Sequence, residues 1–398
     1  MTSFVNKWDK NIPVEKSPYI FESDYQILCN PKIKINNEFT MIDLFCGAGG
    51  FSVGGEWAGF QSILGLDYLK PAITTWKENH PNAISILGDI TKINPLDIKK
   101  LTGGINIDLI TAGVPCQGFS LANRKHNTED KRNYLFLDLM RFIEVFNPKA
   151  VIIENVSALR SRGNGKFEKE ILGALDTLGY SGVVKTLNAA DYGVPQLRER
   201  VFFVGLKNGK EFEFPEGKFK NISRNQKIKD NKHFPYRTVY DAISDLPKIE
   251  SHQSAEEYDE KPITDYQELM RGFSNILSIK KCDKVYNHVA PRHDLGTIEK
   301  IRTTEPGKPM YPKFKQRIRL SYDNPSPTQL AGGIRPQFQF GHPELNRGLT
   351  IRERARIQSF PDSYIFTGSV VQERVQTGNA VPPLLVYEIL KELKKYLG

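Results

Sequence analysis

The pattern of apolar and polar positions predicts a sheet-forming first half of the chain. From Phe39 onward, short runs rich in Ile, Leu and Val alternate with amphipathic stretches. The runs are 39–45, 61–67, 83–87, 107–112 and 150–154, each bounded by Gly, Pro or Asn. Between residues 134 and 146 the apolar positions instead fall on one face of a helix. This alternation predicts a parallel sheet covered by helices on both faces.

The second half of the chain has a different character. Strand patterns at 183–188 and 200–206 have no long helix between them, which predicts an antiparallel hairpin at the sheet edge. After Leu206 the charges fall in blocks, basic at 218–237, acidic at 245–268 and basic at 298–319. Helical patterns return at 350–359 and 383–397. We therefore expect an α/β fold with these parts: an extension (1–38), a first domain (39–206), an inserted smaller domain (207–320) and a return to the first domain (321–398).

Composition adds limits on location and partners. Hydrophobic residues make up 39% and charged residues 25% of the chain, an ordinary balance for a globular protein. There is no apolar run of about 18 residues and no secretory signal, so we expect a cytoplasmic protein without a membrane span. The net charge is +9, and segment 207–319 holds 23 Lys and Arg against 17 Asp and Glu. A basic balance favours a polyanionic partner.

The four cysteines are Cys29, Cys46, Cys116 and Cys282. They are far apart, and no pair has the C-x-x-C spacing of a zinc or redox site. We expect neither a metal site nor a disulfide framework.

A glycine-rich turn follows the first predicted strand. The strand enters Cys46-Gly47-Ala48-Gly49-Gly50, the kind of turn that cradles a ligand at the carboxyl end of a strand. Asp67 ends the second strand and Asp89 follows the third, and an acid at the second position suits ribose hydroxyls. A nucleoside-bearing cofactor is therefore expected. A dinucleotide dehydrogenase could share this pattern, but Ser52 stands where its third glycine would be.

Cys116 follows the fourth predicted strand. It lies in Gly113-Val114-Pro115-Cys116-Gln117-Gly118, where the proline stiffens the turn and the glycines let it bend. A thiol is a weak nucleophile unless its site favours the thiolate. Glu154 ends the neighbouring fifth strand, so it should face the same crevice, either as a helix cap or as a proton donor.

The predicted edge hairpin carries Gln196-Leu197-Arg198-Glu199-Arg200. In a strand, Gln196, Arg198 and Arg200 would point to one face. Such a row suits a phosphate or a bound base.

Together and in this order, these segments resemble the DNA cytosine-5 methyltransferases of bacterial restriction-modification systems. The resemblance covers about residue 39 to the C-terminus. The matching motifs are Asp43–Phe51, Pro115–Gln117, Glu154–Val156, Gln196–Arg200, Arg347–Arg356 with Phe360–Asp362, and Gly378–Pro383.

The resemblance implies S-adenosylmethionine as methyl donor and a methyltransferase fold with an inserted target-recognition domain. It places the adenine against Phe45 and the methionine end in the turn of Gly47, Gly49 and Gly50. It further places the ribose on Asp67, the adenine amino group on Asp89, and Asn379 at the closing wall of the pocket.

The resemblance also implies the catalytic roles. The Cys116 thiolate would add to C6 of a flipped cytosine, Glu154 would stabilise charge at N3, and Arg198, with Arg200 beside it in the motif, would hold the base. The polar segment 117–132 would close over the base and contact DNA through Gln117, Ser120, Arg124 and Arg132.

The expected partner is double-stranded DNA, bound by a monomer, and family analogy allows a restriction endonuclease of the same specificity. Three alternatives stay open: an RNA cytosine-5 methyltransferase, a dinucleotide-dependent oxidoreductase, and a catalytically silent DNA-binding regulator. The long insert favours DNA over RNA.

Overall fold

The computed structural model describes residues 25–115, 135–161, 165–222, 232–331 and 338–398. The chain forms two compact units. The first unit consists of Met1–Leu187, Glu199–Pro215 and Val386–Gly398, and the second of Asn188–Arg198 and Glu216–Leu385. Each unit is described by itself.

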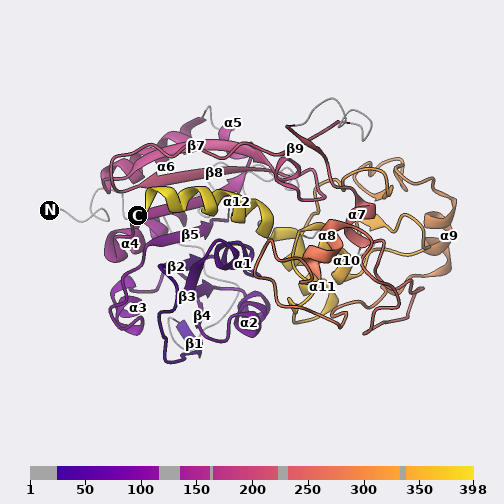
Figure 1. Ribbon diagram of the computed structural model, residues 1–398, viewed down its shortest axis with the longest axis horizontal. Coiled ribbons are helices and arrows are strands. Elements are labelled where there is room, and N and C mark those ends of the chain that lie inside the picture. Colours follow the sequence, from indigo (N-terminus) through magenta and orange to yellow (C-terminus); the bar gives the residue numbers. More distant parts are fainter. Residues whose placement is uncertain (1–24, 116–134, 162–164, 223–231, 332–337) are drawn as a thin grey trace. The chain divides into compact units, whose positions relative to one another are not determined.

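An eight-stranded mixed sheet forms the first unit (Figure 1), with strand order β1-β4-β3-β2-β5-β6-β8-β7. The strands are β1 (Tyr25–Cys29), β2 (Phe39–Leu44), β3 (Phe60–Asp67), β4 (Ile84–Gly88), β5 (Leu109–Gly113), β6 (Ala150–Val156), β7 (Ser181–Asn188) and β8 (Glu199–Leu206). The pairs β3–β4, β2–β3, β2–β5 and β5–β6 are parallel, whereas β1 pairs antiparallel with β4 and β8 with β6. The predicted parallel sheet and its last two strands are therefore confirmed.

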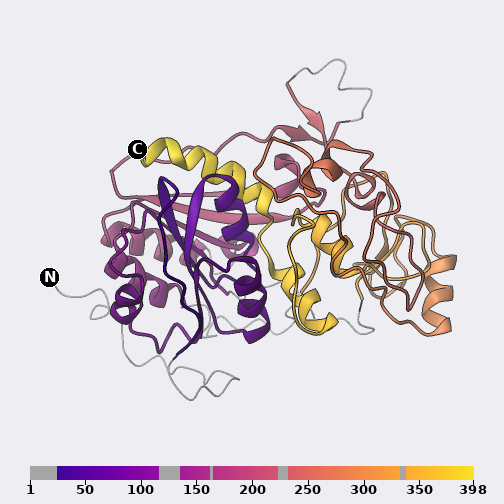
Figure 2. The same ribbon diagram turned by 60° about the horizontal axis from the view of Figure 1, so that its bottom comes forward.

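Helices cover both faces of this sheet (Figure 2). They are α1 (Gly50–Trp57), α2 (Lys70–Asn79), α3 (Pro95–Leu101), α4 (Leu135–Phe146), α5 (Ala158–Ser161), α6 (Lys166–Thr177), α12 (Pro383–Leu393) and the 3₁₀ helix η6 (Lys394–Tyr396). On one face, α3, α4 and α6 bury residues such as Ile98, Phe142 and Ile171 against β2 and its neighbours. On the other, a Cβ at Gly55 of α1 would meet Met41 of β2 and Leu390 of α12.

The second unit is irregular and has short elements. They are η4 (Ala189–Tyr192), β9 (Phe219–Lys220), β10 (Phe234–Pro235), α7 (Val239–Ile243), α8 (Asp265–Met270), α9 (Leu295–Thr303), β11 (Ile318–Arg319), β12 (Phe340–Gly341), α10 (Ile351–Ile357) and α11 (Val370–Asn379). The two strand pairs β9–β10 and β11–β12 are both parallel.

The units differ from the expected domain boundaries at both ends. Residues 25–29 form β1 and pair with β4, so this part of the expected extension belongs to the sheet. Segment 321–385, expected in the first domain, belongs to the second unit, and only 386–398 returns to the first. For segment 321–385 the physical reason is a set of buried charge contacts that tie Arg356 of α10 to Asp245 and Asp362, described below.

Candidate active site

The glycine-rich turn lies where β2 ends and α1 begins. Phe45, Gly47 and Gly49 all have positive φ, of 55°, 54° and 84°, so the turn requires the left-handed conformation three times in five residues. A Cβ added at Gly47 would meet open space rather than protein atoms. The turn therefore exposes backbone that a ligand could approach closely.

Asp67, at the end of β3, braces this turn. Its Oδ2 accepts a hydrogen bond from the Gly47 N–H at 2.8 Å and its Oδ1 accepts one from the Leu69 N–H at 2.7 Å. Burial raises the pKa of Asp67 to about 6, although both main-chain N–H groups favour the ionised form. Asp89 follows β4, is half-buried, and accepts hydrogen bonds from the backbone and hydroxyl of Thr91. The two acids and the turn thus belong to one end of neighbouring parallel strands, as predicted.

Glu154 lies beside the end of β5. It is paired in register with Gly113, three residues before Cys116, and only 8% of it is exposed. Its carboxylate forms an ion pair with Arg200 of β8, with 2.9 Å between Oε1 and Nε. Burial lowers the pKa of Arg200, while Glu154 opposes that shift. The pair places an acid and a cation together next to the segment that leads to Cys116.

Sequence reasoning missed the role of Asn155. Its Nδ2 donates to the Val114 carbonyl at 3.1 Å, and its Oδ1 accepts from the Val156 N–H at 2.8 Å. The amide therefore ties the end of β5 to the end of β6. Only its position directly after Glu154 could have signalled this contact.

The predicted row of Gln196, Arg198 and Arg200 on one strand face is wrong. Strand β8 begins at Glu199, so only Arg200 lies in it. Gln196 and Arg198 belong to the second unit, and both side chains are fully buried there. Gln196 bonds to Gln358, and the Arg198 guanidinium donates to the carbonyl of Gly378 at 2.9 Å. Arg198 is therefore an internal bridge of the second unit, whereas Arg200 accompanies Glu154.

Five predicted residues lie outside the described part of the chain: Cys116, Gln117, Ser120, Arg124 and Arg132. Asn379 is the exposed last residue of α11 in the second unit. Within the described residues there is no group of three or more His, Cys, Asp or Glu side chains that could hold a metal ion. None of the helices there has the length and apolar character that a membrane span needs.

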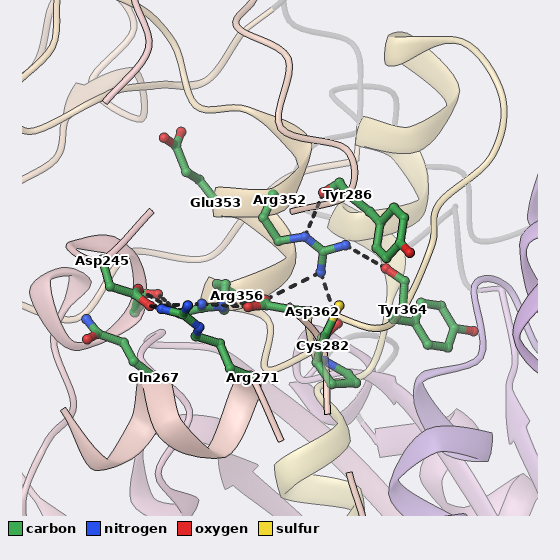
Figure 3. Close-up of polar contacts among 12 residues, drawn as sticks. Asp245, Gln267, Arg271, Cys282, Tyr286, Arg352, Glu353, Arg356, Asp362 and Tyr364 are labelled. Carbon is green, nitrogen blue, oxygen red and sulfur yellow. Dashed lines mark hydrogen bonds and ion pairs between the residues drawn. The ribbon is translucent and has the colours of Figure 1, made fainter. Parts of the chain in front are cut away.

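A buried charge network organises the second unit (Figure 3). The Arg356 guanidinium, fully buried in α10, pairs with Asp362 at 2.5 Å and with Asp245 at 3.1 Å. Arg352 donates to the carbonyls of Tyr286 and Tyr364 at 2.8 and 2.6 Å. Asp245, from the acidic block 245–268, lies in this interior, where its carboxylate pairs with Arg271 and Arg356.

Breaking this network is expected to destabilise the protein. In Asp362→Asn, Arg356 loses one of its two carboxylate partners, and we expect the free energy of unfolding to fall by about 3–5 kcal/mol. The matched control is Glu299→Gln, which breaks the exposed pair with Arg302 in the same unit and should leave the free energy of unfolding nearly unchanged, because water screens this pair. Urea unfolding measures both, and equal losses would contradict the assignment.

The same network determines whether acid raises or lowers the stability of the protein. Burial opposes ionisation of Asp362, but Arg356 and Arg352 outweigh it and hold the pKa of this carboxyl below its ordinary value. Its contribution to stability is therefore present above about pH 4, the ordinary carboxyl pKa, and is lost as the pH falls through the folded-state pKa.

Comparisons with known proteins agree with the arrangement of these elements. Residues 39–395 match the family model for C-5 cytosine-specific DNA methylase. The chain is 33% identical to the Type II methyltransferase M1.HphI of Haemophilus parahaemolyticus, over 94% of this chain and 90% of that protein. It is 37% identical to the Type II methyltransferase M.DdeI of Desulfomicrobium norvegicum, over 89% and 88%.

Solved structures share the fold. A structure described as a DNA modification methyltransferase encoded within an E. coli prophage superimposes with a TM-score of 0.73 and 26% identity, over 90% of this chain and 99% of that one. The S. pombe Dnmt2 methyltransferase matches with a TM-score of 0.57 at 16% identity, over 90% and 99%, and shows the fold alone.

Proposed function

This chain belongs to the C-5 cytosine-specific DNA methylase family, and from that premise we propose that Cys116, Glu154 and Arg200 carry its reaction. The chain is a DNA cytosine-5 methyltransferase of the Type II restriction-modification kind and uses S-adenosylmethionine. The oxidoreductase, the RNA-modifying enzyme and the silent regulator are therefore set aside.

The need for a nucleophile follows from the substrate. C5 of cytosine is too poor a carbon nucleophile to take a methyl group directly, and thiolate addition at C6 makes it reactive. Cys116 lies three residues after Gly113, which is paired with Glu154 in the sheet. That register is the observation which carries the proposal. The target base must leave the stacked duplex to reach these groups, at a cost of a few kcal/mol.

The Glu154–Arg200 ion pair suggests how charge on the base is handled. Negative charge develops toward N3 after addition at C6, and Glu154 would stabilise it there by sharing a proton. Arg200 would donate to the O2 carbonyl, the role first expected of Arg198. The reassignment rests on the 2.9 Å contact with Glu154 and on the burial of Arg198 among main-chain carbonyls.

The first unit has residues that fit S-adenosylmethionine. The open space at Gly47 suits the amino-acid end of the cofactor, and the half-buried ring of Phe45 suits the adenine. The carboxylate of Asp67 suits the ribose hydroxyls, and that of Asp89 suits the adenine amino group. Gly49 and Gly50 would keep the turn close to the ligand, and Asn379 remains the expected closing residue. When bound, the cofactor supplies a methyl group on a positively charged sulfur.

The second unit is proposed to read a short duplex sequence. Two arginines of the basic block 298–319, Arg317 and Arg319, are buried, and Arg319 donates to the carbonyls of Ile301 and Thr304 at the end of α9. The exposed cations of this block are Lys300, Arg302, Lys308, Lys313 and Lys315, and such side chains suit DNA phosphates. Gln117, Ser120, Arg124 and Arg132 are proposed to contact DNA around the flipped base.

The wider role follows by analogy with the Type II relatives. We propose that the enzyme acts as a monomer in the cytoplasm and protects host DNA from an endonuclease of the same specificity. Mapping methylated cytosines in DNA from cells that express this chain tests the activity and yields the target sequence. Unmodified DNA in such cells would contradict the proposal.

Asn155→Ala is expected to slow the reaction without loss of cofactor binding. Removing the amide frees the Val114 carbonyl and loosens the segment that leads to Cys116. We expect kcat to fall about 10-fold or more, since small misplacements of reacting groups cost this much. Affinity for S-adenosylmethionine, measured by calorimetry, should change less than threefold. A matching fall in both quantities would instead indicate general damage.

A further inference from the structure

Asp43 is a buried carboxyl group directly beneath the cofactor turn. It lies in β2, two residues before the turn begins, and is 1% exposed. Its Oδ2 accepts from the Ser52 hydroxyl of α1 at 2.7 Å, and its Oδ1 accepts from the Thr111 hydroxyl of β5 at 3.1 Å. Trp76 of α2 donates in turn to the Ser52 hydroxyl at 2.8 Å. The carboxyl group therefore links β2, α1, β5 and α2 at the base of the site.

The surroundings of Asp43 stabilise its ionised form only in part. Burial raises its pKa to about 7, against the hydrogen bonds from Ser52 and Thr111 and the charge of His80. His80 of α2 is paired at 2.8 Å with Glu56 of α1. Cys46 interacts electrostatically with both Asp43 and Asp67. Asp43 thus has a proton to lose in the neutral range.

The hydrogen-bond geometry suits both states of the carboxyl group. The Thr111 hydroxyl lies 3.1 Å from Asp43 Oδ1 and 3.4 Å from the carbonyl oxygen of Ile42. When Asp43 is ionised, Thr111 donates to it. When Asp43 is protonated, it can donate to Thr111, whose own hydrogen then turns to Ile42. Either state leaves these groups satisfied, so protonation requires no rearrangement.

The methyl donor and the product differ by one charge. S-adenosylmethionine carries a sulfonium, and transfer of its methyl group to C5 leaves the neutral thioether S-adenosylhomocysteine. A buried carboxylate attracts a cation strongly because little water screens it. We propose that ionised Asp43 makes the cofactor site favour the cationic methyl donor over the neutral product. This inference rests on the proposed position of the cofactor at the Gly47–Gly50 turn.

Linkage gives the consequence that can be measured. If the donor binds the ionised form better, donor binding releases a proton from Asp43, and donor affinity rises as the pH rises through its titration. The product should show little of this dependence. Ionised Asp43 would then help the enzyme exchange spent product for fresh donor.

The test is calorimetric binding of S-adenosylmethionine and S-adenosylhomocysteine at pH 6 and pH 8, in wild type and Asp43→Asn. For wild type we expect the ratio of donor to product affinity to rise about tenfold, as for one charge pair at moderate range. In Asp43→Asn this ratio should change less than twofold between the two pH values, after correction for titration of the amino groups of the free ligands. Ser85→Ala is the matched control, because Ser85 is a buried strand hydroxyl without a partner among the described residues.

If the ratio of donor to product affinity depends on pH in Asp43→Asn as it does in wild type, the inference is wrong. Should this variant not fold, Thr111→Val takes its place, since loss of a donor to the carboxylate should move the midpoint of the profile to higher pH. If the midpoint of the pH profile does not move in Thr111→Val, the inference is also contradicted. Asp67→Ala distinguishes a wrong inference about Asp43 from a wrong cofactor site. Unchanged donor affinity in Asp67→Ala would contradict the proposed cofactor site itself. Lost affinity there, with an unaltered profile in Asp43→Asn, would contradict only the inference about Asp43.

Discussion

Replacing Cys116 with alanine is expected to lower methyl transfer by a factor on the order of 10⁴ or more. A covalent nucleophile cannot be substituted by its neighbours, and removal of such groups costs factors of this size. Without thiolate addition at C6, C5 of the cytosine does not become reactive. Transfer of a labelled methyl group from S-adenosylmethionine to duplex DNA measures the loss.

Trapping separates loss of the nucleophile from loss of folding. A duplex with 5-fluorocytosine at the target position has no C5 proton to lose, so the wild-type enzyme should form an adduct that resists denaturation and requires the methyl donor. Cys116→Ala should bind the duplex and form no adduct. Cys29→Ala removes a free, half-buried thiol of β1 and should trap like the wild type. An adduct with Cys116→Ala would contradict the assignment of Cys116 as the nucleophile.

The strand ends of the first unit could be predicted because their causes are local. Short apolar runs bounded by Gly, Pro or Asn mark the ends of strands, so Asp67 and Glu154 were expected near the carboxyl ends of their strands. Asp43 carried only a weak signal, an acid inside the apolar run Met41–Leu44. Its hydrogen bonds to Ser52 and Thr111 depend on how three elements pack.

The boundary of the second unit could not be predicted because its causes are distant. Charged residues usually lie at the surface, and the sequence showed Asp245 only as part of an acidic block and Arg356 only as part of a helical motif. In the structure they pair across 111 positions of the chain, fully buried. Such compensation between distant charges is invisible in a single sequence. The same reason explains why Arg198, bonded to the carbonyl of Gly378, was misplaced on a strand.

That misplacement leads to the second large expected effect. In Arg200→Ala, Glu154 loses its partner and the base loses the proposed donor to O2, so we expect kcat to fall by about 10²–10³-fold, as when one charged donor is removed from a developing oxyanion. Arg200→Lys should recover only part of the activity, because an ammonium cannot reproduce the planar fork of donors. Thermal unfolding should show both variants folded at the assay temperature, with a lower melting temperature for Arg200→Ala because it removes a buried ion pair.

Arg198→Ala provides the contrast, since its guanidinium holds the main chain of the second unit together. Loss of its bonds to Gln329 and Gly378 should lower the free energy of unfolding by about 2–4 kcal/mol. The folded fraction should still form the 5-fluorocytosine adduct, whereas Arg200→Ala should form it slowly while fully folded. The reverse outcome, a stable but inactive Arg198→Ala beside an active Arg200→Ala, would return the base-holding role to Arg198. The two arginines of one motif thus have separable duties, because one lies in the strand beside Glu154 and the other is sealed inside the second unit.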